Sequence, residues 1–286
     1  MNENTINNTI DHRCKACFLK TYRRLFGKFN VSIETQNNFL SYFDEVIAKY
    51  HNGLDIQRHL HHKFYELVGT FDPFVEEKEN SNLVGLQLYE KYQPQVLNAE
   101  NPFDMALRLA IAGNIMDYAA SNSFDIQETI NKVLRTTFAI DDSQLLYQKT
   151  KEAKKILYLG DNAGEIVFDK LFIETLDPNK VIFAVRNAPI LNDVTLKDAE
   201  KVGLEKVAQI VSNGFNGPST VLSQCSKEFL NIYASADLIL SKGQGNFEGL
   251  MEENDTRLFF LLMTKCDVIA EKLNVEKGSF IVYNKK

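Results

Sequence analysis

Asp161, Asn162 and Asp193 are the side chains of this sequence whose types best suit a divalent metal ion. Carboxylate and amide oxygens are the hard donors that Mg²⁺ and Mn²⁺ prefer, with water completing the shell. Taken singly, Asp161 and Asp193 are equally suited to capping the helices expected after them. A metal site therefore requires that the fold bring these two short segments together.

Lys242 and the glycine-rich turn around Gly164 suit a phosphate group. Lys242 lies among glycines, and a lysine in such a turn is a mobile cation suited to a phosphoryl oxygen. The segment at Gly164 opens a helix, and the backbone N–H groups of a helix start favour phosphate. Taken alone, Lys242 also fits a solvated turn residue, and Asn246 and Glu248 fit helix-start residues without a ligand. Metal, helix starts and lysine together fit phosphoryl chemistry.

The elements that must position these residues form an α/β pattern after residue 154. Apolar or β-branched runs predict strands, at Ile156–Leu159, Val181–Val185, Ala208–Ser212, Leu238–Ser241, Leu258–Met263 and Phe280–Tyr283. Helical segments are expected between them, near Glu165–Leu176, Thr195–Val202, Thr220–Ala234, Phe247–Glu253 and Asp267–Leu273. This alternation predicts a mostly parallel, Rossmann-like sheet between two helical layers. Polar clusters follow the first four runs and should meet at the carboxyl edge of the sheet, where ligands bind.

The first half of the chain reads differently. Glycine and proline are scarce up to about Thr150, and apolar residues recur at helical spacing, as in Leu40, Phe43 and Ile47. We expect a region of six or seven helices at 1–150, with 1–13 disordered, followed by an α/β catalytic core at 151–286.

Composition excludes several classes of protein. The chain has 286 residues, of which 44% are hydrophobic and 24% charged, with a formal net charge of −6. This apolar content argues against a disordered protein, and the acidic balance argues against a nucleic-acid partner. The longest apolar stretches are far shorter than the roughly 20 residues of a membrane helix, and the polar start does not resemble a signal peptide. We expect a cytoplasmic protein with no membrane partner; the pattern does not indicate an oligomeric state.

Three strings of the sequence resemble a known family. Residues 158–169, the pair Asn192-Asp193 and residues 241–248 are similar to motifs of the metal-dependent damage-control phosphatases, long catalogued as domain of unknown function 89. The likeness covers nearly the whole chain and includes residues 72–74 and 113–117. The early Cys14-x-x-Cys17 resembles the prokaryotic, stand-alone branch.

This resemblance implies a phosphatase that acts on small phosphorylated metabolites, either sugar phosphates or damaged phosphometabolites. It implies an α/β/α sandwich with a helical N-terminal part, which agrees with the pattern above. It also implies a divalent ion (Mn²⁺, Mg²⁺, Co²⁺ or Ni²⁺) on Asp161, Asn162 and Asp193, with Lys242 at the phosphate. The residues that we expect at the substrate are Gly164, Glu165, Asn114, Asp117, Asn246 and Glu248.

A mechanism follows as a hypothesis. The metal binds a phosphoryl oxygen and lowers the pKa of water, which attacks phosphorus in line with the leaving oxygen. Lys242 and the N–H groups after Asn162 stabilise the equatorial oxygens. The rival is attack by Asp161 itself to give an aspartyl-phosphate. Haloacid-type phosphatases pair that nucleophile with an acid two residues on, where this chain has Ala163, so we favour attack by water.

Two other functions remain open at this point. A methyltransferase that uses S-adenosylmethionine would show a glycine-rich turn after the first strand and an acid after the second. Here the turn carries metal-type donors, and Arg186 follows the second strand, which suits an anion better than a ribose. A non-catalytic phosphometabolite sensor would keep Lys242 and the glycines but would not need Asp161 together with Asp193.

Cysteine and histidine give weaker signals. Cys14 and Cys17, with His12 nearby, supply too few ligands for a zinc site by themselves, and a redox role is a further alternative; the simpler interpretation is thiols that pack without a chemical role. His59, His61 and His62 do not share one helix face, so a solvated surface is the simpler interpretation.

Overall fold

The computed structural model describes residues 10–113 and 126–285, and the chain divides into two compact units between Pro73 and Phe74. The sequence predicts a division near residue 150, and the structure differs. The helices between residues 75 and 152 belong to the same unit as the sheet, because apolar side chains such as Leu107 and Leu109 are buried in one cluster with β-strand residues. Amphipathic periodicity marks a helix but does not show which surface its apolar face covers.

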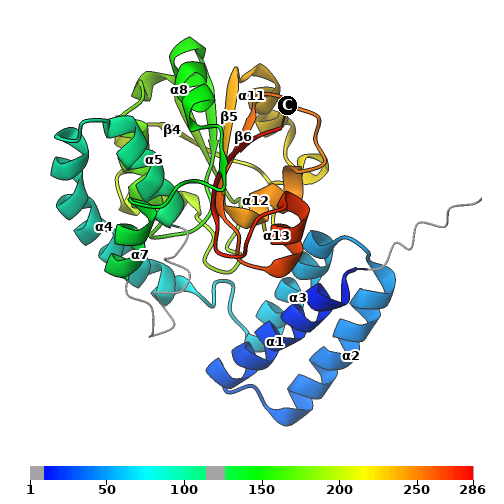
Figure 1. The fold of residues 1–286 in the computed structure, drawn as a ribbon. Coiled ribbons are helices and arrows are strands. Elements are labelled where there is room, and N and C mark those ends of the chain that lie inside the picture. The colour runs from blue at the N-terminus through cyan, green and yellow to red at the C-terminus, as the bar shows by residue number, and fades with distance from the viewer. Residues whose placement is uncertain (1–9, 114–125, 286) are drawn as a thin grey trace, which may run out of the picture. The chain divides into compact units, whose positions relative to one another are not determined.

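The first unit consists of three helices, labelled in Figure 1 as α1 (His12–Lys28), α2 (Ile33–Lys49) and α3 (Gly53–Val68). Side chains of Asp11, Ser32 and Asn52 accept hydrogen bonds from backbone N–H groups at the three helix starts. Of residues 1–13, which we expect to be disordered, residues 10–13 are described, and His12 already belongs to α1.

The second unit contains a seven-stranded sheet in the order β1-β7-β6-β5-β2-β3-β4. All neighbouring strands are parallel except β6 and β7, which run antiparallel. The strands are β1 (Ile140–Asp141), β2 (Ile156–Leu159), β3 (Val181–Val185), β4 (Gln209–Ser212), β5 (Leu238–Lys242), β6 (Leu258–Met263) and β7 (Phe280–Asn284). The six predicted runs correspond to β2–β7, which confirms the mostly parallel α/β fold.

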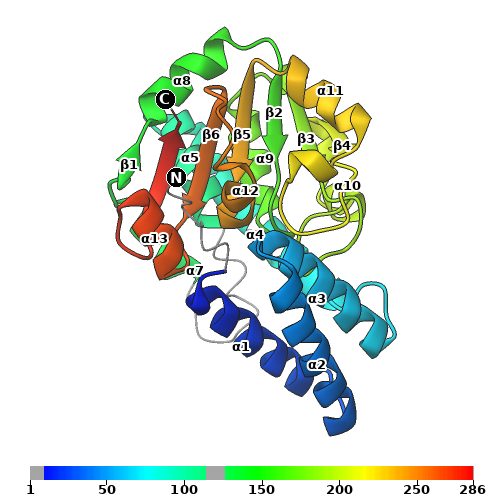
Figure 2. The same cartoon turned by 90° about the vertical axis from the view of Figure 1, so that its right-hand side faces the viewer.

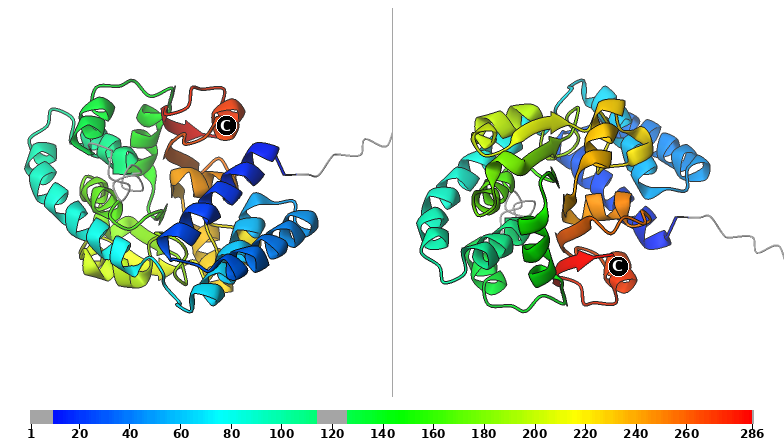
Figure 3. Two further views of the ribbon diagram at one scale, coloured as in Figure 1. Left: turned by 90° about the horizontal axis from the view of Figure 1, so that it is seen from below. Right: turned by 90° about the horizontal axis from the view of Figure 1, so that it is seen from above.

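Helices cover both faces of this sheet (Figures 2 and 3). Their bounds are α4 (Val75–Leu97), α5 (Pro102–Ala112), α7 (Ile126–Val133), α8 (Ser143–Glu152), α9 (Ile166–Glu174), α10 (Leu196–Lys201), α11 (Lys227–Ser235), α12 (Gly243–Leu250) and α13 (Asp267–Leu273). Short 3₁₀ turns lie at Pro178–Lys180, Leu204–Lys206 and Leu222–Gln224. None of the helices within the described ranges is long and apolar enough to cross a membrane.

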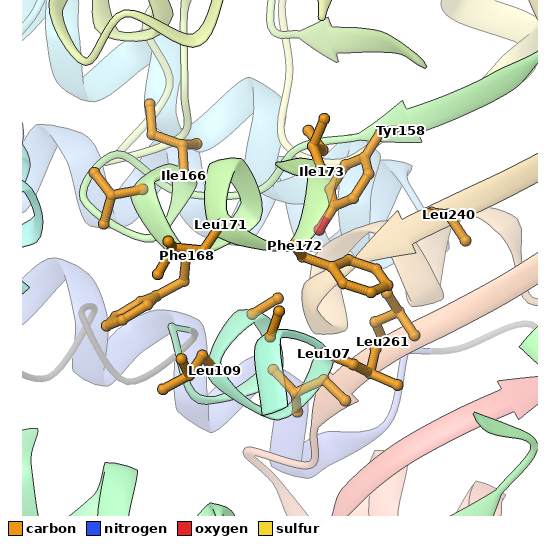
Figure 4. Packing of buried hydrophobic residues seen from close by; sticks show 14 of the residues in the cluster. Leu107, Leu109, Tyr158, Ile166, Phe168, Leu171, Phe172, Ile173, Leu240 and Leu261 are labelled. Carbon is orange, nitrogen blue, oxygen red and sulfur yellow. The ribbon is translucent and has the colours of Figure 1, made fainter. Parts of the chain in front are cut away.

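Alternate residues of each central strand point to opposite layers. Ile156 and Tyr158 of β2 join the cluster of α4, α5 and α9, whose packing Figure 4 shows, and Leu157 and Leu159 join that of α11, α12 and α13. Both faces are therefore dry, so the polar residues of the loops can gather only at the strand ends.

Candidate active site

The loops after β2, β3, β4 and β5 all leave the carboxyl edge of the parallel part of the sheet. Each of these connections contains a residue with a positive φ angle, as in Gly164 in the loop after β2 and Gly243, which begins α12 directly after β5. In the loops after β3 and β4, Leu191 and Ser219 adopt this conformation without being glycine. Side chains other than glycine are strained there, and such strain is common at functional sites. The turns are therefore held by the surrounding structure.

Asp161, Asn162 and Asp193 come together as the sequence predicts. Asn162 and Asp193 form an isolated antiparallel bridge, and the N–H of Val194 donates to the carbonyl of Asp161 at 2.9 Å. A further bond joins the N–H of Ala163 to the carbonyl of Asn192 at 2.9 Å. All three candidate metal ligands are buried, with 4–6% of their surface exposed. Backbone pairing between two loops thus fixes the donor set.

The amide of Asn162 is oriented by two carboxylates. Its Nδ2 donates to Oδ2 of Asp161 at 3.0 Å and to Oε2 of Glu165 at 3.1 Å. No described residue donates to its Oδ1, so that oxygen remains available as a donor to a cation. No three His, Cys, Asp or Glu side chains of the described ranges form a metal-binding group. The set here has two carboxylates and one amide, and these oxygen donors fit a hard divalent ion that also keeps water ligands.

Arg186, immediately after β3, lies against the same carboxylates. Its Nε donates to Oδ2 of Asp193 at 2.6 Å, and its Nη2 lies 3.8 Å from Oδ1 of Asp161. The guanidinium is buried, and Nη2 has no hydrogen-bond partner among the described residues. The set of candidate site residues predicted from the sequence omits this arginine, although its place at the end of the second strand was a signal for an anionic partner.

Lys242 is placed differently from the prediction. It ends β5 instead of lying in a mobile turn, and its side chain is fully buried. The Nζ atom donates to Oε1 of Glu165 and to Oδ1 of Asp169, each at 2.5 Å, and Tyr158 also donates to Asp169 at 2.7 Å. Burial alone would lower the pKa of Lys242, but Asp169 and Glu165 raise it above its usual value. Lys242 is therefore a charged lysine held between two carboxylates.

Gly164 has a structural role in addition to its place beside the site. Its φ angle is 78°, and a Cβ atom there would lie 2.8 Å from the Cβ and the carbonyl oxygen of Ser81. From the sequence, we expect the N–H of Gly164 to face a phosphate. In the structure it donates to Oδ1 of Asn82 at 2.7 Å. Asn82 in turn donates to Asp198 at 3.3 Å. This chain of contacts attaches α4 and α10 to the loop after β2.

The remaining predicted site residues lie on α12 or outside the described residues. Asn246 donates to the carbonyls of Gly160 at 2.9 Å and Lys242 at 2.8 Å, and its buried Oδ1 has no partner. Glu248 accepts from Gln244 at 2.9 Å on the same helix. Burial raises the pKa of Glu248 above its usual value. Asn114 and Asp117 lie outside the described residues.

A cavity of about 460 Å³ lies at the opposite, amino-terminal edge of the sheet. Lys154, Lys180 and Lys206 are among the residues that line it, and none of the candidate site residues does. The buried carboxyl-edge cluster, and not this cavity, therefore holds the chemistry that the sequence predicts.

Comparisons with known proteins agree with this architecture. The family model of the damage-control phosphatase ARMT1-like domain matches residues 10–281. The chain is 32% identical to damage-control phosphatase PH1575 of Pyrococcus horikoshii, over 97% of this chain and 98% of that protein. It is 28% identical to a damage-control phosphatase of Archaeoglobus fulgidus, over 95% of this chain and 98% of that protein. The crystal structure of PH1575, described as a DUF89 family protein, matches with a TM-score of 0.87 over 97% of this chain and 99% of that chain. The chain therefore belongs to the damage-control phosphatase ARMT1-like family.

Proposed function

We propose that this protein is a divalent-metal-dependent phosphatase that hydrolyses small phosphorylated metabolites, such as sugar phosphates or damaged phosphometabolites. Relatives named damage-control phosphatases support the reaction class. The observation that supports the metal dependence is the convergence of Asp161, Asn162 and Asp193, which backbone pairing between two loops brings together and whose two aspartates lie against the same arginine, Arg186. Mn²⁺, Mg²⁺, Co²⁺ and Ni²⁺ all accept such oxygen donors.

Asp161, Asn162 and Asp193 would hold the ion. A divalent ion in this place polarises a phosphoryl oxygen and makes water a better nucleophile. Asn162 is kept in its orientation by Glu165, since the amide donates to that carboxylate at 3.1 Å. Arg186 keeps one carboxylate oxygen of Asp193 in place through its Nε atom. The second layer of contacts is therefore built before any ligand arrives.

Lys242 contributes to this arrangement through Glu165. Because one oxygen of Glu165 accepts from Lys242 and the other from Asn162, the buried lysine fixes the carboxylate that orients the amide. We assign Lys242 this positioning role, in place of direct contact with the phosphate. Its charge also offsets one of the two negative charges of the buried acids Glu165 and Asp169.

Water remains the proposed nucleophile in place of Asp161. The carboxylate of Asp161 accepts from Asn162 and lies 3.8 Å from the guanidinium of Arg186, an arrangement suited to a charged ligand group. The residue two positions on is Ala163, which cannot act as an acid toward a leaving group. Trapping of a phosphoenzyme at Asp161 would contradict this assignment.

The test is hydrolysis of para-nitrophenyl phosphate with added Mn²⁺ or Co²⁺. We expect Asp161→Ala and Asp193→Ala each to lower kcat/KM by at least about 100-fold, because each removes a proposed metal ligand. EDTA should abolish phosphate release by the wild-type protein. Glu205→Ala, which removes an exposed acid at the opposite edge, is the matched control and should keep the wild-type rate. Near-wild-type rates for both aspartate variants, with folding shown by circular dichroism, would refute the proposed site.

A further inference from the structure

We propose that Arg186 is the side chain that binds the phosphoryl group of the substrate. This inference rests on the proposed phosphatase function and adds a catalytic residue to it. Among the described residues, Lys242 and Arg186 are buried cations that contact acids of the proposed site, and their surroundings differ in one respect. One has its contacts made by the protein, and the other retains an N–H group without a partner.

Lys242 is the cation whose charge is already neutralised. Its ammonium group contacts two carboxylates, and its side chain has no exposed surface. Because this side chain has no exposed surface, a phosphoryl oxygen could reach Lys242 only if the residues around it moved.

Arg186 has an unused donor. One bond, from Nε to Asp193 at 2.6 Å, holds the planar group in place, while Nη2 is buried and makes no hydrogen bond. A buried N–H group without an acceptor costs free energy, so an acceptor at this position is favoured. Guanidinium groups match phosphate oxygens in shape and charge.

The position of Nη2 indicates where that acceptor binds. The atom lies 3.8 Å from Oδ1 of Asp161, which is too long for a hydrogen bond and places the donor beside a proposed metal ligand. The side chains of Asp161 and Asp193 each keep 9% of their surface exposed, whereas that of Arg186 keeps 1%. An oxygen that enters on the carboxylate side therefore meets the metal ligands and the Arg186 donor together.

Charge supports the same assignment. At the proposed metal position, the charges of the two aspartates and a divalent ion would cancel, and the guanidinium adds a positive charge beside them that attracts a phosphate dianion. The transferred group carries its negative charge on oxygens that fixed donors stabilise. Arg186 is fixed in advance by Asp193, so little reorganisation is needed when the phosphoryl group binds.

The experiment compares Arg186→Gln and Arg186→Lys with the wild-type protein by isothermal titration calorimetry and by kinetics. Inorganic phosphate is titrated into each Mn²⁺-loaded protein, and Mn²⁺ is titrated separately into each metal-free protein. For Arg186→Gln we expect phosphate affinity to fall at least about 10-fold and kcat/KM at least about 100-fold. Mn²⁺ affinity should fall less than phosphate affinity, because no metal ligand is removed and the glutamine amide keeps an N–H donor for Asp193. Arg257→Gln is the matched control, because Arg257 also pairs with an aspartate, Asp255, away from the site.

Four outcomes bear on this proposal or on the proposed function. Unchanged phosphate affinity in Arg186→Gln overturns it, and so does a loss of Mn²⁺ affinity larger than the loss of phosphate affinity, which would show that Arg186 only positions the ligands. If Arg186→Gln does not fold, Arg186→Lys decides, because it keeps the charge and loses the planar fork; a wild-type phosphate affinity there overturns the proposal. A wild-type protein that binds phosphate through Arg186 but hydrolyses no phosphoester would instead refute the proposed function and leave this assignment standing.

Discussion

Glu165 connects the two halves of the proposed site at the scale of single residues. One of its oxygens accepts from the amide of Asn162 and the other from Lys242. The glutamate is fully buried, so neither contact is replaced by water. Glu165, which the sequence predicts at the substrate, thus orients the amide of Asn162, a proposed metal ligand.

Replacement of Glu165 by Gln should weaken the metal site. The NH₂ group of the glutamine would face either Nδ2 of Asn162 or Nζ of Lys242, and both of these groups are donors too. The Asn162 amide would then lose its fixed orientation. We expect Mn²⁺ affinity, measured by calorimetry, to fall by about 10- to 100-fold. Glu174→Gln, at the other end of α9, is the control, since Glu174 binds Tyr89 and Gln93 instead. Equal Mn²⁺ affinities in both variants would argue against the positioning role.

Gly164 and Gly278 separate two effects of adding a methyl group. Both have positive φ angles, but only at Gly164 would the new Cβ meet other atoms, at 2.8 Å from Ser81. We expect Gly278→Ala to lower the free energy of unfolding by about 1–2 kcal/mol through backbone strain. Gly164→Ala should cost about 1–3 kcal/mol more, because the loop and α4 must also separate. Urea unfolding of the two variants measures the difference, and equal losses would contradict the close packing at Gly164.

At the scale of elements, continuous apolar runs predicted the strands well. The same pattern gave no information about which ion pairs form. Runs of β-branched and apolar residues predicted β2, β3 and β6 to the residue, because strands buried on both faces are continuous in sequence. The two-residue β1 is too short to leave such a signal. Helix α12 begins at Gly243, four residues before the predicted start, because glycines that resemble a loop form its first turn.

The contacts of Lys242 were beyond sequence reasoning for a physical reason. Asp169 lies on the buried face of α9 among apolar residues, and nothing in its spacing shows that it meets a strand end much later in the chain. By contrast, the convergence of Asp161 with Asp193 follows from topology alone, since both loops leave neighbouring parallel strands. The sequence therefore predicts where the site lies better than it predicts which cations face it.

The histidines of α3 show a similar limit and lead to a prediction about pH. His61 is buried, not solvated as predicted, and its Nδ1 lies 2.9 Å from the hydroxyl of Tyr22. Burial lowers the pKa of His61 from 6.5 to about 3. Between these values the unfolded chain binds more protons than the folded one. The neutral, buried His61 therefore does not lower the free energy of unfolding above pH 6.5, and the free energy of unfolding falls as the pH decreases below that value.

We expect this loss to be specific to His61. On going from pH 7 to pH 5, the wild-type three-helix unit should lose about 2 kcal/mol relative to His61→Gln, which has no proton to gain at this position. Hydrogen exchange of α1 and α3 in the full-length proteins, compared at each pH, measures the difference. A wild-type-to-variant difference that does not change with pH would show that His61 is protonated or exposed in the folded state.

At the scale of the whole molecule, every described site residue belongs to the second unit. The sheet, both helical layers and the cluster around Asp161 lie after Pro73. We therefore expect a fragment of residues 74–286 to fold by itself and to bind Mn²⁺ with an affinity close to that of the full chain. Circular dichroism and calorimetry on the fragment test this expectation, with its Asp161→Ala variant as the control. A fragment that unfolds would show that the sheet needs the first unit for its stability.

The place of β2 in the sheet has a consequence for synthesis of the chain. This strand pairs with β3 on one side and with β5 on the other, and β5 is translated only after β3, β4 and their helices. While the ribosome completes those elements, the hydrogen-bonding edge of β2 has no strand to pair with, and an open apolar edge invites association with other chains. The last strand to reach β2 is the one that ends in Lys242. The strand that closes this edge of β2 therefore also carries the lysine that lies between Glu165 and Asp169.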